Sequence, residues 1–340
     1  MNNFRHLAFL LLFSSSFAIG QGFNSQQWLS QPDSQQTQPS DPFISNIVFK
    51  STDGGKTLEN ISNGLPKNLK KDGQGNRGIG DEAFANSGGL YVPAGNSLYF
   101  NDPNSTGFSW KKEQFPGKMS SIAPGKAGMY AYNYGGQIVQ KANGTSGWLP
   151  VYTSFQGNVG TIFETAGGTV FIGSDNGLFK STNSGKTWKH VHAGGWVIKL
   201  VEQNGTLLAT SMSGIIRSTD DGEHWAVVIS EGGVGIDVAA IKDGFAAITF
   251  NTQSNNRRVR SSYDGGKTWQ LIDAGLPASS SISSIVQVGE SLFCGHPFGI
   301  YQSSDKGKTW KCIRCSVDGK VYNLSVSGNV LYAIPQSGGC

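Results

Sequence analysis

The amino-acid sequence predicts an all-β fold, a seven-bladed β-propeller. Three observations lead to it: an eight-residue pattern recurs along the chain, its copies stand about forty residues apart, and glycine is frequent, with 47 glycines in 340 residues. A repeat period near forty residues suits one four-stranded propeller blade. Abundant glycine suits short strands that are joined by tight turns.

The repeated pattern is Ser-x-Asp-x-Gly-x-Thr-Trp, and its clearest copies begin at Ser218, Ser262 and Ser303. A short apolar run precedes each copy and predicts a strand that enters a turn. The Asp carboxylate can accept backbone N–H groups of that turn, glycine can adopt its φ, and Trp can cover the hairpin. We therefore predict structural roles for the Asp and Trp residues of the pattern: Asp53, Asp220, Asp264, Asp305, Trp188, Trp225, Trp269 and Trp310.

Counting the copies predicts seven blades. The copy at Ser181 has Asn183 in place of Asp, and the copy at Ser51 ends on Leu58 instead of Trp. Two degraded copies end at Trp110 and Trp148 and fill the long interval between the first two clear ones. The chain enters directly at a copy of the pattern and ends with two alternating runs that no further copy follows. We expect the N- and C-terminal strands to share one blade, which would close the ring and remove two open edges.

The repeats carry a resemblance to a known group. The consensus is similar to the Asp-box, or BNR repeat, of the propellers found in sialidases, xyloglucan-type hydrolases, sortilin-type receptors and photosystem II assembly factors. The resemblance implies the propeller architecture, and it implies that binding or catalysis takes place on the face opposite the repeats. Function does not follow from the fold alone.

The chain divides into three parts. Residues 1–20 have an apolar core from Leu7 to Phe13, too short to span a bilayer, and predict a signal peptide. Residues 21–44 are rich in Gln, Ser and Pro and predict a disordered leader. Residues 45–340 make up the propeller. We expect a secreted or periplasmic monomer without membrane insertion, and the net charge of +4 does not favour a nucleic-acid partner.

Two groups of residues are candidates for ligand binding on the loops opposite the repeats. His190, His192 and Trp196 form the first group; a regular strand would place both imidazoles on one side. No third ligand accompanies them, so we expect no metal site and no cofactor. Arg257 and Arg258 form the second group, as the core of a local arginine cluster.

Catalysis has weaker support in the sequence. Sialidase chemistry in the family requires an arginine cluster and usually an Arg-Ile-Pro motif, which this chain lacks. Asp175, Asp237, Glu164 and Glu231 are candidate acids for a xyloglucan-type hydrolase, whose mechanism depends on their separation. We therefore predict a non-catalytic propeller that binds a protein or a glycan. The alternative is a glycoside hydrolase of sialidase-like architecture.

Four cysteines lie in the last fifth of the chain: Cys294, Cys312, Cys315 and Cys340. Export would make disulfides the default state. Four cysteines allow three complete pairings, and the sequence leaves the choice open. A bond from Cys340 to Cys312 or Cys315 would clamp the C-terminal tail beside the ring closure.

Overall fold

The computed structural model describes residues 48–66, 83–86, 88–94, 96–105, 109–119, 121–316 and 321–335. Contacts divide the chain into two units, Met1–Asp41 and Pro42–Cys340, and every described residue belongs to the second unit. The predicted signal peptide (1–20) and leader (21–44) lie outside the described residues, so both stay predictions.

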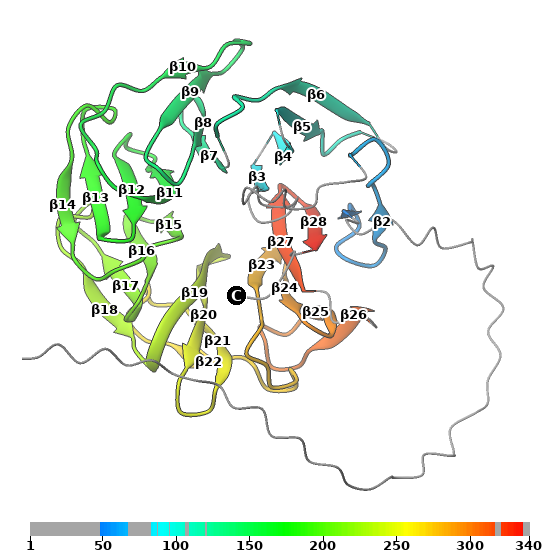
Figure 1. Cartoon of the computed structure of the whole chain (residues 1–340). Helices are drawn as coiled ribbons and strands as arrows, with labels where there is room; N and C mark the ends of the chain where they lie inside the picture. Colours follow the sequence, from blue (N-terminus) through cyan, green and yellow to red (C-terminus); the bar gives the residue numbers. More distant parts are fainter. Residues whose placement is uncertain are drawn as a thin grey trace, which may run out of the picture. The chain divides into compact units, whose positions relative to one another are not determined.

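The described residues form seven antiparallel sheets of four strands each, without helices, arranged as the blades of a β-propeller (Figure 1). This confirms the predicted fold class and number of blades. Blade 1 contains both ends of the described chain: β1 (Phe49–Ser51), β2 (Glu59–Asn60), β27 (Tyr322–Ser327) and β28 (Val330–Pro335).

The other six blades follow in chain order, and each runs from its innermost to its outermost strand. Blade 2 is built from β3 (Phe84–Asn86), β4 (Gly89–Ala94), β5 (Ser97–Asn101) and β6 (Trp110–Gln114). Blade 3 is built from β7 (Ser121–Gly125), β8 (Gly128–Tyr132), β9 (Ile138–Ala142) and β10 (Leu149–Pro150). Blade 4 is built from β11 (Val159–Glu164), β12 (Val170–Ser174), β13 (Gly177–Ser181) and β14 (Lys189–His192). Blade 5 is built from β15 (Leu200–Gln203), β16 (Thr206–Ser211), β17 (Gly214–Ser218) and β18 (Ala226–Ile229). Blade 6 is built from β19 (Gly232–Ile241), β20 (Gly244–Asn251), β21 (Asn256–Ser262) and β22 (Gln270–Leu271). Blade 7 is built from β23 (Ser284–Val288), β24 (Ser291–His296), β25 (Gly299–Ser303) and β26 (Lys311–Cys315).

Blade 1 closes the ring as the sequence predicts. Its strand order is β2-β1-β28-β27, so the C-terminal strands supply the two inner positions and the N-terminal strands the two outer ones. Strand β1 pairs with β28 through Phe49 opposite Ala333 and Ser51 opposite Leu331. The pairing therefore holds both ends of the described chain in one sheet.

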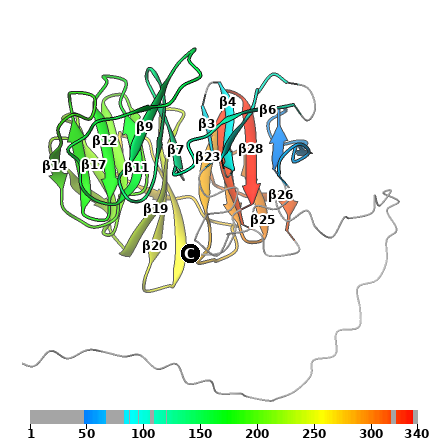
Figure 2. The ribbon, with the colours of Figure 1, turned by 45° about the horizontal axis from the view of Figure 1, so that its top comes forward.

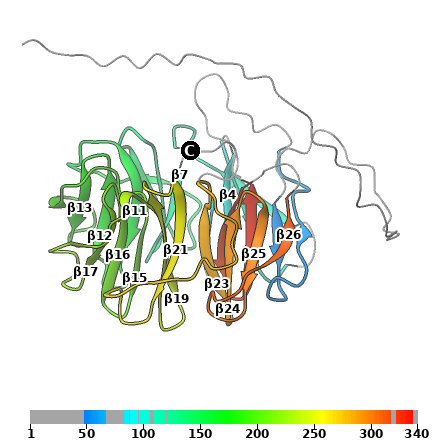
Figure 3. The ribbon, with the colours of Figure 1, turned by 90° about the horizontal axis from the view of Figure 1, so that it is seen from below.

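The antiparallel order sorts the loops onto two faces of the ring. The loops with the repeated pattern join the third and fourth strands of a blade, and the turns between its first and second strands lie at the same edge. We call this edge the box face and the repeated loops the box loops. The turns between second and third strands, and the connections between blades, lie at the opposite edge, the loop face. Figures 2 and 3 show the strands running between these two faces.

The hydrophobic core lies between neighbouring blades. Second strands are buried along their length, as in β16, whereas the fourth strands β10 and β22 are exposed. Phe171 and Leu178 of blade 4 pack with Leu200 and Leu207 of blade 5 in one cluster. Burying each such side chain contributes roughly 1.5–3 kcal/mol, so the contacts between blades are a main source of stability.

Three fourth strands contain a β-bulge at the same place. The register shifts in blades 4, 5 and 7 leave one extra residue in the outer strand: Val191 between His190 and His192, Val228 between Val227 and Ile229, and Ile313 between Cys312 and Arg314. An extra residue reverses which face the following side chains occupy. The bulges therefore determine how the histidines and cysteines of these strands point.

Candidate functional site

The box loops are stabilised by a repeated set of hydrogen bonds. In the loop of blade 7, the Ser303 hydroxyl accepts the Gly307 N–H at 2.8 Å and donates to Asp305 Oδ1 at 2.8 Å. Asp305 also accepts the Thr309 N–H at 2.9 Å and the Thr309 hydroxyl at 2.6 Å. Chiefly through the bond from the Thr309 hydroxyl, the pKa of Asp305 falls from 3.8 to about 2.

The other acidic box loops repeat this arrangement. The Thr57 hydroxyl lowers the pKa of Asp53 to about 2. The pKa of Asp220 is lowered chiefly by the backbone N–H of His224, and that of Asp264 chiefly by the Thr268 hydroxyl. Each of these carboxylates is engaged as an acceptor within its own loop, as expected of a turn-forming Asp.

The box tryptophans fall into two kinds, which the sequence did not distinguish. Trp225 and Trp269 donate their indole N–H to Gly222 and Gly266 of their own loops, at 3.0 and 3.1 Å. The other four donate to the preceding blade or the connection that follows it: Trp110 to Ile61 O, Trp148 to Gln114 O, Trp188 to Thr153 Oγ1 and Trp310 to Ile272 O. The expectation that Trp covers its own hairpin is therefore incomplete, because these four indoles link neighbouring blades.

A second tie between blades comes from the residue that precedes the first Ser of the box loop. Lys50, Lys180, Arg217 and Gln302 each reach the box loop of the next blade: Lys50 binds Ser105 O at 3.0 Å, Lys180 binds Glu223 at 2.7 Å, Arg217 binds Gly265 O at 2.6 Å and Gln302 binds Gly54 O at 3.1 Å. Polar side chains of the box face thus link four pairs of neighbouring blades.

His190 and His192 lie on strand β14 near the loop face. His190 stacks on Phe179, with ring centroids 4.5 Å apart, and its Nε2 lies 3.0 Å from Asn176 O. His190 pairs with Phe179 and His192 with Leu178, two residues that face opposite sides of the sheet. The expectation that both imidazoles lie on one side is wrong, because the bulge at Val191 intervenes.

His192 is half-buried on its own side of the sheet. Its Nε2 is buried and has no hydrogen-bond partner. Burial, with a smaller contribution from the charge of His190, lowers the pKa of His192. A neutral imidazole is therefore favoured here.

The predicted arginines are engaged within the fold. Arg258 forms a two-point ion pair with Asp273, with Nε 2.6 Å from Oδ2 and Nη2 3.2 Å from Oδ1. Arg257 Nη1 donates to Ile282 O at 2.8 Å. A planar guanidinium bound at two points is held in place, so Arg258 supports the connection from blade 6 to blade 7.

The four candidate acids also have partners, and they do not gather in one place. Glu231 pairs with Arg260, and buried Asp237 pairs with Lys199 at 2.5 Å. Asp175 Oδ2 accepts a bond from Asn158, while its Oδ1 is buried without a partner. Glu164 lies at the box-face end of β11, where it accepts bonds from the Tyr130 hydroxyl and Lys126 N–H. Glu164 is therefore at the opposite edge of its sheet from Asp175, and the two cannot act on one bond.

One exposed apolar surface of the loop face spans blades 3 to 5. Tyr134 lies in the turn from β8 to β9, Trp196 and Ile198 in the connection from β14 to β15, and Met212 in the turn from β16 to β17. Tyr134, Ile198 and Met212 are about half exposed, at 47%, 50% and 50%. We call these four residues the apolar patch.

Contacts position three members of the patch. The Tyr134 and Trp196 rings stack, with centroids 5.7 Å apart and planes 28° apart. Met212 lies against Gly195, where an added Cβ would be 2.8 Å from Met212 Cγ. Trp196 in turn lies over Gly160 of β11, where an added Cβ would be 3.1 Å from Trp196 Cζ3. Two glycines thus make room for the patch.

The sequence identified one member of the patch, Trp196, and missed the other three. Tyr134 and Met212 are single apolar residues in the short turns from β8 to β9 and from β16 to β17, and an apolar residue in a turn is the signal that would have found them. In a turn, an apolar side chain has no strand periodicity to indicate burial, so only the structure shows that these residues are exposed together.

The described residues hold neither a cluster of metal ligands nor a membrane-spanning helix. No group of three or more His, Cys, Asp or Glu side chains gathers there closely enough to hold a metal ion. No helix long and apolar enough to cross a membrane occurs in the same residues.

Comparison with known proteins shows the fold. No protein-family model and no curated protein matches the chain in sequence. Among solved structures, it is similar to YCF48 bound to D1 peptide, with a TM-score of 0.52 and 14% identity, covering 77% of this chain and 94% of that one.

Two enzymes are also similar in structure. An ancestral GH74 enzyme has a TM-score of 0.57 and 18% identity, over 79% of this chain and 45% of that one, so the chain spans less than half of its length. A catalytically inactive virginiamycin B lyase from Staphylococcus aureus, in complex with quinupristin, has a TM-score of 0.56 and 12% identity, over 79% and 98%. Likenesses at these identities establish a shared β-propeller fold and leave function to the residues of the site.

Proposed function

We propose that this protein is an exported, non-catalytic propeller of the Asp-box type that binds a polypeptide through the apolar patch on its loop face. The observation that carries the proposal is the joint exposure of Tyr134, Ile198 and Met212 beside the partly buried Trp196, on three neighbouring blades. Exposed apolar surface that side chains of separate elements build together is typical of interaction sites. The box loops at the opposite face support the Asp-box assignment by their repeated Ser–Asp–Thr bonding.

The composition of the patch favours a polypeptide over a glycan. A sugar ring stacks on a free aromatic face, but Tyr134 and Trp196 already stack on each other. Ile198 and Met212 add aliphatic surface, and methionine adapts its shape to varied apolar partners. The solved YCF48 structure, which has the same fold, contains a bound peptide. We therefore expect an apolar side chain of an extended segment to contact the patch.

The engagement of the candidate acids supports a binding role over hydrolysis. Hydrolysis of a glycoside needs one protonated carboxyl and one free carboxylate on either side of the bond. Glu231 and Asp237 are held by Arg260 and Lys199, and Glu164 lies at the other edge of its sheet. We expect no turnover of sialosides or neutral polysaccharides. Turnover of a neutral polysaccharide that Asp175→Asn abolishes would favour the hydrolase alternative instead.

Selection from a displayed peptide library tests the proposal. We expect the wild-type protein to enrich peptides with apolar side chains, and we expect Tyr134→Ser and Trp196→Ser each to weaken binding of the selected peptides at least tenfold, about 1.4 kcal/mol. Tyr263→Ser is the matched control, because Tyr263 is 45% exposed but lies in a box loop at the other face. Its binding should equal that of the wild type.

Two results would contradict the proposal. One is equal loss of binding in Tyr134→Ser and Tyr263→Ser, which would mean that the patch has no special role. The other is binding to a glycan array without any peptide selection, which would replace the polypeptide by a carbohydrate. The melting temperatures of Tyr134→Ser and Tyr263→Ser should remain within about 2 °C of wild type, because these two rings are about half-exposed.

A further inference from the structure

The cysteine pair of strand β26 is bridged in a way that depends on its bulge. Cys312 and Cys315 form a disulfide, with Cα atoms 5.8 Å apart. Residues three apart in a regular strand point to opposite faces, which would prevent the bond. Cys312 pairs with Tyr301 and Cys315 with Gly299, two positions on the same side of β25, because Ile313 is the extra residue of the bulge. The bulge thus brings both sulfur atoms to one face.

The Cys312–Cys315 bond excludes some of the possible disulfide pairings of the four cysteines. A bond from Cys340 to Cys312 or Cys315 does not form, since these two bond to each other. Cys340 itself lies outside the described residues. Cys294 is a free thiol, fully buried in the core, and burial raises its pKa. It is therefore inert compared with the pair on β26.

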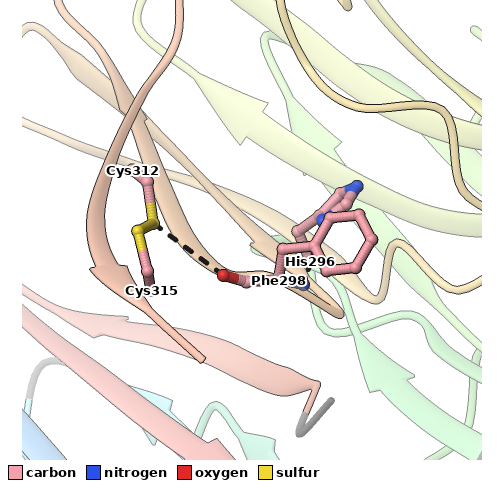
Figure 4. Close-up of a disulfide and its surroundings, with 4 residues drawn as sticks. All are labelled: His296, Phe298, Cys312 and Cys315. Atoms are coloured by element: carbon pink, nitrogen blue, oxygen red, sulfur yellow. Dashed lines mark hydrogen bonds between the residues drawn. A yellow bond between two sulfur atoms is a disulfide. The ribbon is translucent and has the colours of Figure 1, made fainter. Parts of the chain in front are cut away.

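The disulfide is accessible. It lies on the outermost strand of blade 7, near the loop face, where Cys315 is exposed and Cys312 is half-buried. Figure 4 shows the bridge beside the turn that carries Phe298.

The architecture of the blade does not require this disulfide. Blades 4 and 5 form the same bulge with His190 and Ala193, or Val227 and Ser230, at the positions of Cys312 and Cys315. Strand β26 is already paired with β25 from Gly299 to Gln302. A bond across only three residues also restricts the unfolded chain less than a bond that closes a long loop.

The reduced form of the cysteine pair would also have a hydrogen-bond acceptor in the structure. The carbonyl oxygen of Phe298 lies 3.8 Å from Cys312 Sγ, so a protonated Cys312 thiol has an acceptor in position. The same turn binds the strand end through Ser316 N–H to Phe298 O at 2.9 Å. Breaking the disulfide would therefore leave β26 in place.

We propose that Cys312 and Cys315 form an exchangeable disulfide, a redox site that accepts electrons from an external dithiol. One thiolate of the dithiol attacks the exposed Cys315 Sγ, the bond between the two protein sulfurs breaks, and Cys312 leaves as a thiolate that takes a proton. The second thiolate of the reagent attacks the sulfur joined to Cys315, which closes the reagent's disulfide and releases Cys315 as a thiol. Two electrons and two protons pass from the dithiol to the protein.

Differential alkylation of the full-length, folded protein tests this exchange, with dithiothreitol as the dithiol. Peptide mapping should find iodoacetamide on neither Cys312 nor Cys315 before reduction and on both after it, while Cys294 reacts only in denaturant. Oxidised glutathione should restore the protected state. The same pattern should appear in the Cys340→Ser variant, and reduction should lower the melting temperature by less than about 5 °C.

Single cysteine variants test the order of attack. In Cys312→Ser, oxidised glutathione should form a stable mixed disulfide on Cys315, and in Cys315→Ser the half-buried Cys312 should form one more slowly. Three results would overturn the proposal: alkylation of the pair before reduction, reduction that requires denaturant, or a fall in melting temperature well beyond 5 °C. The first would mean that no disulfide exists, and the others that it is a structural bond.

Discussion

The box face and the loop face of the ring use their polar groups in opposite ways. On the box face, Asp53 and Asp305 accept the same bonds from their own loops, and Lys180 reaches the loop of the next blade. On the loop face a smaller set repeats in blades 4 and 5, where Ser174 and Ser211 each donate to the carbonyl oxygen three residues on and accept the N–H two residues on. Asp175 Oδ1 and His192 Nε2 are buried there without partners, and an apolar patch faces solvent.

The comparison shows how a repeat protein separates stability from function. The box loops form the same turn with the same hydrogen bonds in several blades, so their residue pattern recurs and can be detected in the sequence. The turns of the loop face share less of their bonding, and binding sites on a rigid scaffold are usually found in such loops. Substitutions on the box face should therefore change stability, whereas those on the loop face should change binding.

The largest effect is expected from Gly307→Ala in the box loop of blade 7. Gly307 has a φ of +84°, and an added Cβ would lie 2.5 Å from Ile272 Cβ of blade 6. Backbone strain and steric overlap should together cost about 2–5 kcal/mol of unfolding free energy, as measured by urea denaturation. Gly205→Ala is the control: its φ is +70°, but no atom lies within 4 Å of the added Cβ. It should lose only about 1–2 kcal/mol, and equal losses would mean that Gly307 does not set the packing between blades.

The two kinds of box tryptophan allow a finer test of how blades are joined. Between blades 6 and 7 the Trp310 indole donates to Ile272 O, and Lys242 also pairs with Glu290. Between blades 4 and 5 Lys180 pairs with Glu223, while the Trp225 indole bonds within its own loop. Trp310→Phe keeps the aromatic ring but leaves Ile272 O without its donor, which should cost about 1–3 kcal/mol.

Trp225→Phe is the matched comparison, because its indole N–H bonds within its own loop and the Lys180–Glu223 pair stays intact. It should lose less stability in the same urea titration. Equal losses for the two variants would show that the bond between blades adds nothing to the bond within a loop. Both indoles are half-buried, so truncation to Ala should cost less than a fully buried Trp would.

Much of the fold could be predicted from the sequence because its signals are local. The box pattern fixes a turn within eight residues, and the regular spacing of its copies fixes the number of blades. The closing blade follows from counting strands at the two ends. Each of these inferences needs only the order of residues, and the structure confirms the architecture they predict.

The candidate site could be predicted only in part because its geometry depends on distant residues. Nothing near Arg258 in the sequence shows that Asp273 binds it, and nothing near Trp310 shows that its indole reaches Ile272 O. The bulge at Val191 adds a single residue without a sequence marker, yet it sends His190 and His192 to opposite faces. One such insertion reverses any inference that rests on strand alternation.

The smallest expected effect is on how the unfolding free energy depends on pH. The box loop of blade 4, which has Asn183 in place of Asp, is a natural control. The pKa of Asp305 is about 2, below its usual 3.8, so an unfolded chain binds more protons than the folded one as pH falls through this interval. The stability due to Asp305 is therefore complete above about pH 4 and is lost as the pH falls toward 2.

Asn183 fills the same place without a charge: it accepts the Thr187 N–H at 3.0 Å and donates to the Thr187 hydroxyl at 2.8 Å. Asp305→Asn should flatten the dependence of unfolding free energy on pH between 2 and 5, and Asn183→Asp should steepen it, in urea titrations at each pH. Unchanged slopes in both variants would mean that the box carboxylates bind their loops no more tightly when ionised.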